Sequence, residues 1–325
     1  MRGRGWTLMA ILAGAAASGT LVRAGQTGVG QTPSGFPLSQ TVRERGSSVT
    51  GAYEGWYYGK DGNTYALVGY FNRNTKQEFD IPVGPNNRIE PGGPDQGQPT
   101  HFLAGRQWGV FSVQLPKDLG NKKLTWTIVA NGFTNAITLH TQADYIVEPY
   151  EDAANKNTPP KLKFEPNGPS VSGAPTSVAA KYTATVGTPL ALTVWASDEG
   201  PKINIPETPA GGRGRGRGRG TTPTTADAAA EPPQGRGRGA GGFGNPPLAV
   251  TWSWMRGPAA PKFDNAKPSI DTNDGGKATT NVTFSAPGDY LLRVEGNDST
   301  GAGGGGFQCC WTTAHVAVAV KAGTQ

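Results

Sequence analysis

The stretch ATTNVTFSAPGDYLLRVEGND at residues 278–298, together with WTTAHVAVAV at residues 311–320, decides the fold class of this chain. In each of three runs the apolar side chains occupy every second position, which is the period of a β-strand with one buried face. The tripeptide Pro287-Gly288-Asp289 between the first two runs has the composition of a turn. We therefore expect three strands, whose buried positions are Val282 and Phe284, then Tyr290, Leu292 and Val294, then Val316, Val318 and Val320.

The composition of the whole chain also favours an all-β protein. Its 325 residues include 49 glycines and 27 prolines, which makes it rich in turn formers. No window shows a sustained helical period. At about 150 residues per domain, the length predicts two domains.

The formal net charge of +6 is unevenly distributed. The arginines of the first 24 residues and the basic side chains of residues 201–247 carry the excess, so the remaining chain has no basic bias. Nucleic-acid-binding proteins usually gather basic residues on a folded surface. The Arg-Gly repeats resemble RNA-binding tails, but export would separate them from cytoplasmic RNA, and we expect no nucleic-acid partner.

The N-terminus has the pattern of a signal peptide. Arg2 and Arg4 precede an apolar run over residues 6–22, and Val22-Arg23-Ala24 ends it with small residues at the two positions that a signal peptidase reads. An N-terminal membrane anchor is the alternative, but glycine, serine and threonine dilute the run below the length of a spanning helix. We expect cleavage after Ala24, a flexible segment over residues 25–50, and no transmembrane segment in the mature chain. The expected location is periplasmic or extracellular.

Residues 51–150 are predicted to form an N-terminal β-sandwich domain. Two hairpins carry this prediction, one turning at residues 60–63 and one at Asn131-Gly132. Asn-Gly is the strongest short-range hairpin signal, because both residues tolerate the positive φ of the turn. A further strand is expected over residues 108–115, and residues 82–99 are expected to be a loop.

A second domain is predicted over residues 161–321, after a polar linker at residues 151–160. Strands are expected at residues 190–194 and 248–254. Between them, the insert at residues 200–247 alternates glycine with arginine over long stretches and offers almost nothing to bury. We therefore expect the insert to be disordered.

The second domain resembles the polycystic-kidney-disease (PKD) type of immunoglobulin-like domain of exported bacterial proteins. The resemblance rests on Val186-Gly187-Thr188-Pro189 before a strand, on Trp252, and on the segment from Pro287 to Gly301. Where that family usually has Trp-Asp-Phe-Gly-Asp, this chain has Trp252-Ser253-Trp254-Met255, so immunoglobulin-like is the broader description. The resemblance implies a structural spacer or a module for protein or carbohydrate adhesion. It also places Tyr290 where such sandwiches tie a tyrosine hydroxyl back to the backbone.

In that topology, the loops after the second and the sixth strands emerge at the same end, which antibodies use for recognition. This end is the predicted binding surface. Four of its residues could also offer oxygen ligands to calcium, although Asp and Asn are common turn residues too. The candidate binding residues are Asp198, Glu199, Asn297, Asp298 and Trp311.

Cys309 and Cys310 are adjacent and are the only cysteines. Thiols seldom stay free outside the cytoplasm, which favours a disulfide between the two. Free thiols or a disulfide to a partner chain are alternatives. A soft metal such as copper or zinc, held with His315, is another, although adjacent strand residues point to opposite faces.

The chain shows none of the common catalytic motifs, such as a nucleophile elbow, a phosphate loop or a zinc-protease helix. We expect a binding or structural protein that is not an enzyme, has no catalytic residues and no cofactor, and contacts protein or polysaccharide. One alternative is a copper or redox protein that uses the Cys-Cys loop. Another is a carbohydrate-binding module, whose candidate stacking residues are Trp56, Tyr57, Tyr58 and Trp108.

Overall fold

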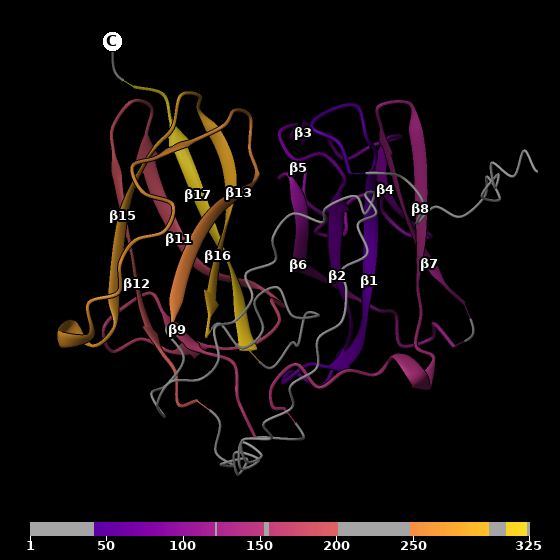
Figure 1. The fold of residues 1–325 in the computed structure, drawn as a ribbon, viewed down its shortest axis with the longest axis horizontal. Coiled ribbons are helices and arrows are strands. Elements are labelled where there is room, and N and C mark those ends of the chain that lie inside the picture. Colours follow the sequence, from indigo (N-terminus) through magenta and orange to yellow (C-terminus); the bar gives the residue numbers. More distant parts are fainter. Residues whose placement is uncertain (1–41, 121, 153–155, 201–247, 299–309, 324–325) are drawn as a thin grey trace, which may run out of the picture. The chain divides into compact units, whose positions relative to one another are not determined.

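The structure, a computed structural model, describes residues 42–120, 122–152, 156–200, 248–298 and 310–323, which belong to one compact unit spanning Gln40–Gln325. Within these ranges the regular elements are β-strands, apart from the short 3-10 turns η2 (Ala143–Tyr145) and η3 (Thr272–Asp274) (Figure 1). The predicted all-β fold is confirmed. The signal peptide expected at residues 1–24, most of the segment 25–50 and all of the insert expected at 200–247 except Gly200 lie outside the described residues.

The first half of the described chain forms a sandwich of two three-stranded sheets, with a small two-stranded sheet beside them. The two larger sheets share one hydrophobic core, in which Val68 and Phe111 from one sheet meet Trp126 and Ile128 from the other. The first sheet has the order β1 (Val49–Tyr58), β2 (Thr64–Asn72), β6 (Gly105–Gln114). The second has the order β4 (Asn87–Glu90), β7 (Leu124–Ala130), β8 (Phe133–Leu139), and the small sheet pairs β3 (Phe79–Asp80) with β5 (His101–Phe102).

Both predicted hairpins are present. β1 pairs with β2 around the loop at residues 59–63, and β7 pairs with β8 in the register Ala130 to Phe133. Asn131 and Gly132 then make a two-residue loop with φ of 49° and 76°, as the mirror-image turn of a tight hairpin requires. The predicted loop at residues 82–99 differs in one respect, because it contains β4, which pairs with β7.

The second half forms a sandwich whose strand order is that of the immunoglobulin fold. Its two sheets correspond to A-B-E-D and A′-G-F-C, and the strand in the A′ position, β11, runs parallel to the last strand, β17. One sheet has the order β10 (Ser170–Val171), β9 (Lys161–Lys163), β12 (Leu190–Ser197), β15 (Lys277–Thr283), β14 (Lys262–Phe263). The other has the order β11 (Val178–Thr185), β17 (Trp311–Lys321), β16 (Gly288–Asn297), β13 (Ala249–Arg256).

Two local features of this sandwich match the immunoglobulin fold. Trp252, on the strand in the C position, is buried in the core. The hydroxyl of Tyr290 donates a hydrogen bond to the carbonyl oxygen of Ala286 at 2.9 Å, which is the expected tyrosine corner. The sequence therefore predicted both the strand that carries Trp252 and the tyrosine corner at Tyr290.

Replacing Tyr290 with phenylalanine should lower the free energy of unfolding by about 0.5–1.5 kcal/mol, because the hydrogen bond to Ala286 is lost without changing the ring packing. Tyr182→Phe on β11 is the matched control, since no hydrogen bond links that hydroxyl to another described residue. Chemical denaturation of both variants measures the difference. Equal midpoints for the two would show that the corner does not contribute to stability.

β2 is buried on both of its faces over most of its length. Ala66, Val68 and Tyr70 face the core between the two sheets, whereas Tyr65 and Leu67 face the other way and are buried too. A strand of an isolated sandwich would expose this second face. The buried second face indicates that the two sandwiches pack against each other.

Candidate functional site

The two sandwiches meet along β6 and β17, in a contact that we call the seam. The ring Nε2 of His315 on β17 lies 2.8 Å from the carbonyl oxygen of Val110 on β6. Arg293 on β16 donates to the carbonyl oxygen of Trp108 at 2.7 Å. These bonds satisfy backbone carbonyls of β6 with side chains from the other sandwich.

A second point of contact lies at the end of β13. The guanidinium of Arg256 donates two hydrogen bonds to the carboxylate of Asp95, at 3.0 and 2.8 Å, and a third to the carbonyl oxygen of Gln98 at 2.7 Å. Paired hydrogen bonds of this kind fix both distance and orientation. The backbone N–H of Thr100 also donates to the carbonyl oxygen of Met255.

Trp311 lies inside the seam. Only 2% of it is exposed, and it packs in a cluster with Tyr57, Tyr65, Leu67 and Ala174. Trp311 therefore offers no surface to a ligand, and its expected place in the binding surface is corrected. It instead fills the space between the sandwiches, because the outer face of β2 supplies the aromatic and aliphatic side chains around it.

Gly109 makes room for this tryptophan. Its φ is +49°, and a Cβ added to it would lie 1.8 Å from the indole of Trp311. The backbone of β6 and the ring of Trp311 are thus in direct contact. Any side chain at position 109 must displace the ring or separate the sandwiches.

An ion pair whose carboxylate is buried lies next to Gly109. Glu54 on β1 accepts hydrogen bonds from Arg106 at 2.7 Å and from the backbone N–H of Gly109 at 2.8 Å. Burial raises the pKa of Glu54, and the positive charges of Arg106 and Arg293 oppose that rise. Burial also lowers the pKa of Arg106. The guanidinium of Arg106 stacks 3.6 Å from the centre of the Trp108 ring, which holds it in place.

His315 makes the stability of the seam depend on pH. Burial lowers its pKa to about 4, and the hydrogen bond to Val110 only partly opposes this. In the unfolded chain the same ring titrates near pH 6.5. Because the unfolded state binds the proton more readily, the contribution to stability is complete above pH 6.5 and falls as the pH drops toward 4.

We therefore expect the free energy of unfolding to lose about 3 kcal/mol through His315 between pH 6.5 and pH 4. His315→Gln retains an N–H donor for Val110 but does not titrate, so it isolates this effect from the carboxylates. Denaturation of both proteins at several pH values measures the difference in slope. Parallel curves for the wild type and the variant would contradict the assignment.

The predicted binding end brings several of its residues together. The side-chain amide of Asn157 donates to the carboxylate of Asp298 at 2.7 Å and to the sulfur of Cys310 at 3.4 Å. Asp298 is fully buried. The burial of Asp198 itself raises the pKa of Asp198, and the neighbouring carboxylate of Asp298 raises it further. Glu199 is paired with Lys161. Asn157 belongs to the segment expected to be a polar linker, and its burial shows that this segment packs.

Other expectations for this end remain predictions. Cys310 is disulfide-bonded, but Cys309, its expected partner, lies outside the described residues. Within the part of the chain that the structure describes, no three His, Cys, Asp or Glu side chains are placed to hold a metal ion. The Nε2 of His315, proposed as a metal ligand, is engaged by Val110 instead. Asn297 lies on β16 opposite Trp311.

The four aromatic residues considered for sugar stacking are placed differently from one another. Trp56 and Tyr57 are buried, and Trp108 is covered by Arg106. Tyr58 is 61% exposed. Near the end of the first sandwich, Tyr145 of η2 is also exposed, and no sequence pattern singled it out.

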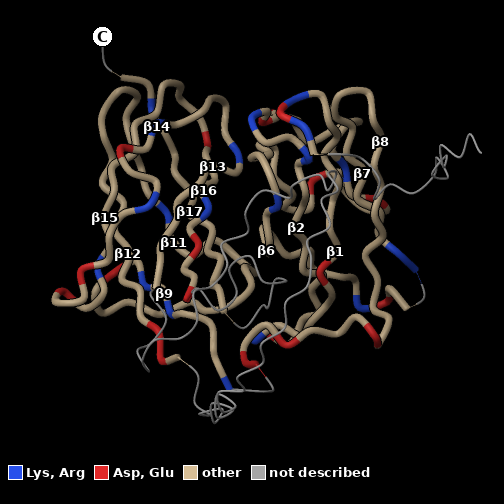
Figure 2. Tube along the Cα trace, in the orientation of Figure 1, with Lys and Arg blue, Asp and Glu red and all other residues tan. Residues whose placement is uncertain are grey.

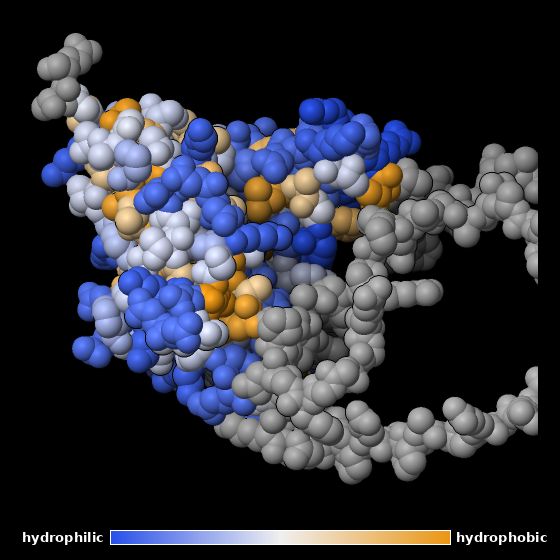
Figure 3. Space-filling model, turned by 60° about the vertical axis from the view of Figure 1, so that its left-hand side comes forward, coloured by the Kyte–Doolittle hydropathy of each residue, from blue (hydrophilic) through white to orange (hydrophobic). Residues whose placement is uncertain are grey.

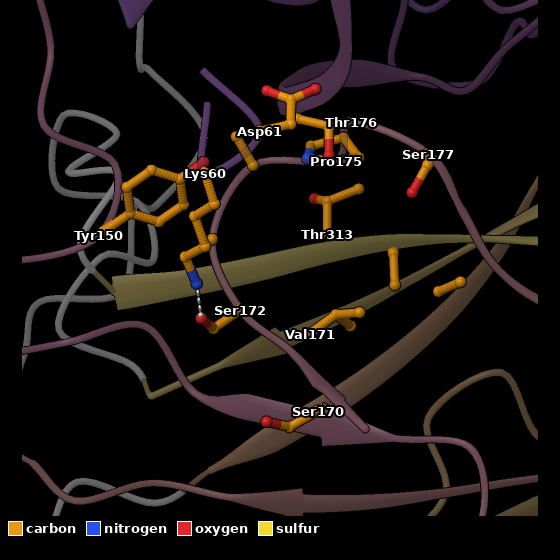
Figure 4. A pocket seen from close by; sticks show the side chains of 14 residues that line it. Lys60, Asp61, Tyr150, Ser170, Val171, Ser172, Pro175, Thr176, Ser177 and Thr313 are labelled. Atoms are coloured by element: carbon orange, nitrogen blue, oxygen red, sulfur yellow. Dashed lines mark hydrogen bonds between the residues drawn. The ribbon is translucent and has the colours of Figure 1, made fainter. Parts of the chain in front are cut away.

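Two cavities are the candidate ligand sites. The smaller, of about 220 Å3, lies between the loop after β1 and the segment after β10 (Figure 4). On one side of it, Lys60 donates to the hydroxyl of Ser172 at 3.1 Å and lies 4.7 Å from the centre of the Tyr150 ring. With its lysine already engaged, this pocket offers serine and threonine hydroxyls and the carboxylate of Asp61.

The larger cavity, of about 540 Å3, lies at the seam, and we call it the seam cavity. Its walls come from both sandwiches, which explains why sequence reasoning missed it: no local pattern connects segments 150 residues apart. His101 stacks on Trp254 with ring centres 4.1 Å apart, and Arg293 and Glu295 form an ion pair on another wall. The remaining lining residues are Glu78, Leu103, Gln107, Thr251, Trp252, Ser253, Ala260, Pro261, Phe263, Ala266 and Lys267.

Lysine and arginine are interspersed with aspartate and glutamate along the described parts of both sandwiches (Figure 2). On the face shown in Figure 3, hydrophobic residues form small separate patches among hydrophilic ones. In the described ranges no helix is long and apolar enough to cross a membrane.

Comparison with known proteins adds little. No family model matches the chain, and no curated protein matches it. Among solved structures, domains 1–6 of the surface layer protein SbsC are 12% identical over 86% of this chain, with a TM-score of 0.23; this chain spans 28% of that one. A titin immunoglobulin tandem is 11% identical over 85% of this chain and 100% of its own, with a TM-score of 0.21. Scores this low establish neither a common fold nor a common function.

Proposed function

We propose that this chain is an exported, non-enzymatic binding or structural protein that contacts protein or polysaccharide at the cell surface or in the periplasm. The observation that carries the proposal is the seam, with the cavity that it creates. A flexible spacer would need no fixed geometry between its modules. Here the buried Trp311, the hydrogen bond from Arg293 to Trp108 and the paired Arg256–Asp95 contact cross the seam and fix that geometry.

The polar contacts across the seam support a role for its geometry. Arg256 pairs with Asp95 through two hydrogen bonds, and Arg293 donates to the carbonyl oxygen of Trp108. Directional contacts of this kind hold one relative position of the two sandwiches, and that position shapes the walls of the seam cavity.

The pattern of the first 24 residues supports export, and the immunoglobulin topology supports contact rather than catalysis, since sandwiches of this kind serve widely as recognition modules. The lining of the seam cavity supports binding. It combines aromatic and aliphatic side chains with a few charged groups, as ligand sites usually do.

The proposal is tested with the purified chain of residues 25–325, immobilised and exposed to polysaccharide and protein fractions of the cell envelope. We expect retention of at least one fraction, with the retained material unchanged in mass after elution. Shortened or chemically altered material would show that the protein is an enzyme. Retention of no fraction would contradict a binding role.

A further inference from the structure

The strand β8 has a neighbour on only one side. It pairs with β7 over all seven of its residues without a bulge, and its other side forms a margin of the first sandwich (Figure 1). On that free side, no other described residue is hydrogen-bonded to the backbone of β8. The edge can pair with a further strand, because its N–H and C=O groups are already aligned for a sheet.

The other edge strands of the first sandwich are protected against such pairing. The outer side of β1 carries a bulge, and its carbonyl oxygen at Trp56 accepts a hydrogen bond from the backbone N–H of Val147. On β6, two carbonyl oxygens are bonded to side chains across the seam. β4 is only four residues long, and two of these, Arg88 and Glu90, are charged. Short, charged, bulged or covered edges resist pairing, whereas β8 is longer, regular and uncharged.

The hairpin between β7 and β8 determines which groups the free edge presents. Ala130 and Phe133 flank the two-residue loop, so the backbone groups of Phe133 point toward β7. The direction alternates along an antiparallel strand, so the N–H and C=O groups of Thr134, Ala136 and Thr138 point to the free side. All three residues are exposed. The edge is therefore a row of three accessible donors and three accessible acceptors.

The sequence of β8 is nearly symmetric about Ala136. A two-fold axis at this residue places Ala136 opposite its own copy and Thr134 opposite Thr138 of the second copy. On the other face of the sheet, Phe133, which is 44% exposed, lies opposite Leu139 of the second copy. Threonine pairs and apolar pairs are both favourable between antiparallel strands. The edge is thus complementary to itself, as a two-fold contact requires.

We propose that the free edge of β8 pairs antiparallel with the same edge of a second copy of this chain. The two sheets of order β4-β7-β8 then form one six-stranded sheet, joined at the axis by about six backbone hydrogen bonds. Residues 124–143 contain no Lys, Arg, Asp or Glu, so the two copies meet without like-charge repulsion. This dimer goes beyond the proposed contact with envelope components and does not depend on it.

Sedimentation velocity of the chain of residues 25–325, at about 1 μM to about 0.5 mM protein, tests the inference. We expect a reversible equilibrium between monomer and dimer. Ala136→Lys places two positive charges opposite each other at the axis and should weaken the dimer at least tenfold. Ala191→Lys on β12 is the matched control, because Ala191 is also exposed but its strand has neighbours on both sides. It should leave the dissociation constant unchanged, and circular dichroism verifies the fold of both variants.

Cysteine cross-linking tests the register. Under mild oxidation, Ala136→Cys should form a covalent dimer, because its Cα lies about 5.5 Å from that of its copy across the axis. Thr134→Cys alone should not, since its two copies lie four residues apart along the strands, or about 14 Å. Mixed with Thr138→Cys, however, it should form a covalent dimer of the two variants. The unsubstituted chain gives the background from its own cysteines.

Three results would overturn the inference. They are a monomer over the whole concentration range, equal effects of Ala136→Lys and Ala191→Lys on the dimer, or cross-linking of Thr134→Cys alone as efficient as that of Ala136→Cys. Retention of an envelope fraction by a monomeric chain would leave the proposed function intact. A dimer that retains no fraction would contradict the proposed function and support this inference.

Discussion

Replacing Gly109 with alanine should lower the free energy of unfolding by about 3 kcal/mol or more. The added Cβ would lie 1.8 Å from the indole of Trp311, so the ring must move in a packed interface. The positive φ of 49° adds about 1–2 kcal/mol for any residue with a Cβ. Chemical denaturation measures the loss.

Two further variants separate the clash from the backbone strain. Gly105→Ala, on the same strand, has a φ of +79° but no atom within 4 Å of the added Cβ, so it reports the strain alone. Trp311→Ala should itself cost about 3–5 kcal/mol. In the Trp311→Ala background, Gly109→Ala should then cost no more than Gly105→Ala does. Equal effects of Gly109→Ala and Gly105→Ala in the wild-type background would contradict the contact.

Replacing Arg106 with methionine should cost about 3–5 kcal/mol, because it leaves the carboxylate of Glu54 buried without a positive partner. The double variant with Glu54→Gln should recover a large part of that loss, since the uncompensated charge is removed. Arg88→Met is the matched control. Its partner, Glu90, is well exposed, so this change should cost about 1 kcal/mol or less.

The effect of Arg106→Met should also depend on pH. Burial already raises the pKa of Glu54, and removing the guanidinium raises it further. The folded variant then binds a proton more readily than the unfolded chain does, so its stability improves as the pH falls. Denaturation at pH 5 and pH 8 should therefore show a smaller loss at pH 5. A loss that is independent of pH would show that Glu54 is not the source of the instability.

The sequence predicted what neighbouring residues determine. The hairpin at Asn131-Gly132 depends on two residues that tolerate positive φ, and the corner at Tyr290 depends on a turn three residues long. The alternating runs of the last strands place their buried faces correctly, because the period of a strand fixes which side chains share a face.

The seam could not be predicted in the same way. Tyr65 and Leu67 lie on the face of β2 that an isolated sheet would turn to solvent, and only the second sandwich buries them. Trp311 was expected at an exposed loop end, yet its ring enters a space that Gly109 opens two hundred residues earlier in the chain. The seam cavity depends on the same long-range packing, because its walls come from both sandwiches.

The two sandwiches form one body, and their contact shapes the seam cavity. Differential scanning calorimetry of the chain of residues 25–325 tests this most directly. The seam predicts a single unfolding transition with equal calorimetric and van't Hoff enthalpies, because neither sandwich can unfold without exposing the buried face of β2 and the ring of Trp311. Two resolved transitions, or a calorimetric enthalpy well above the van't Hoff value, would show that the sandwiches unfold independently and would contradict the account.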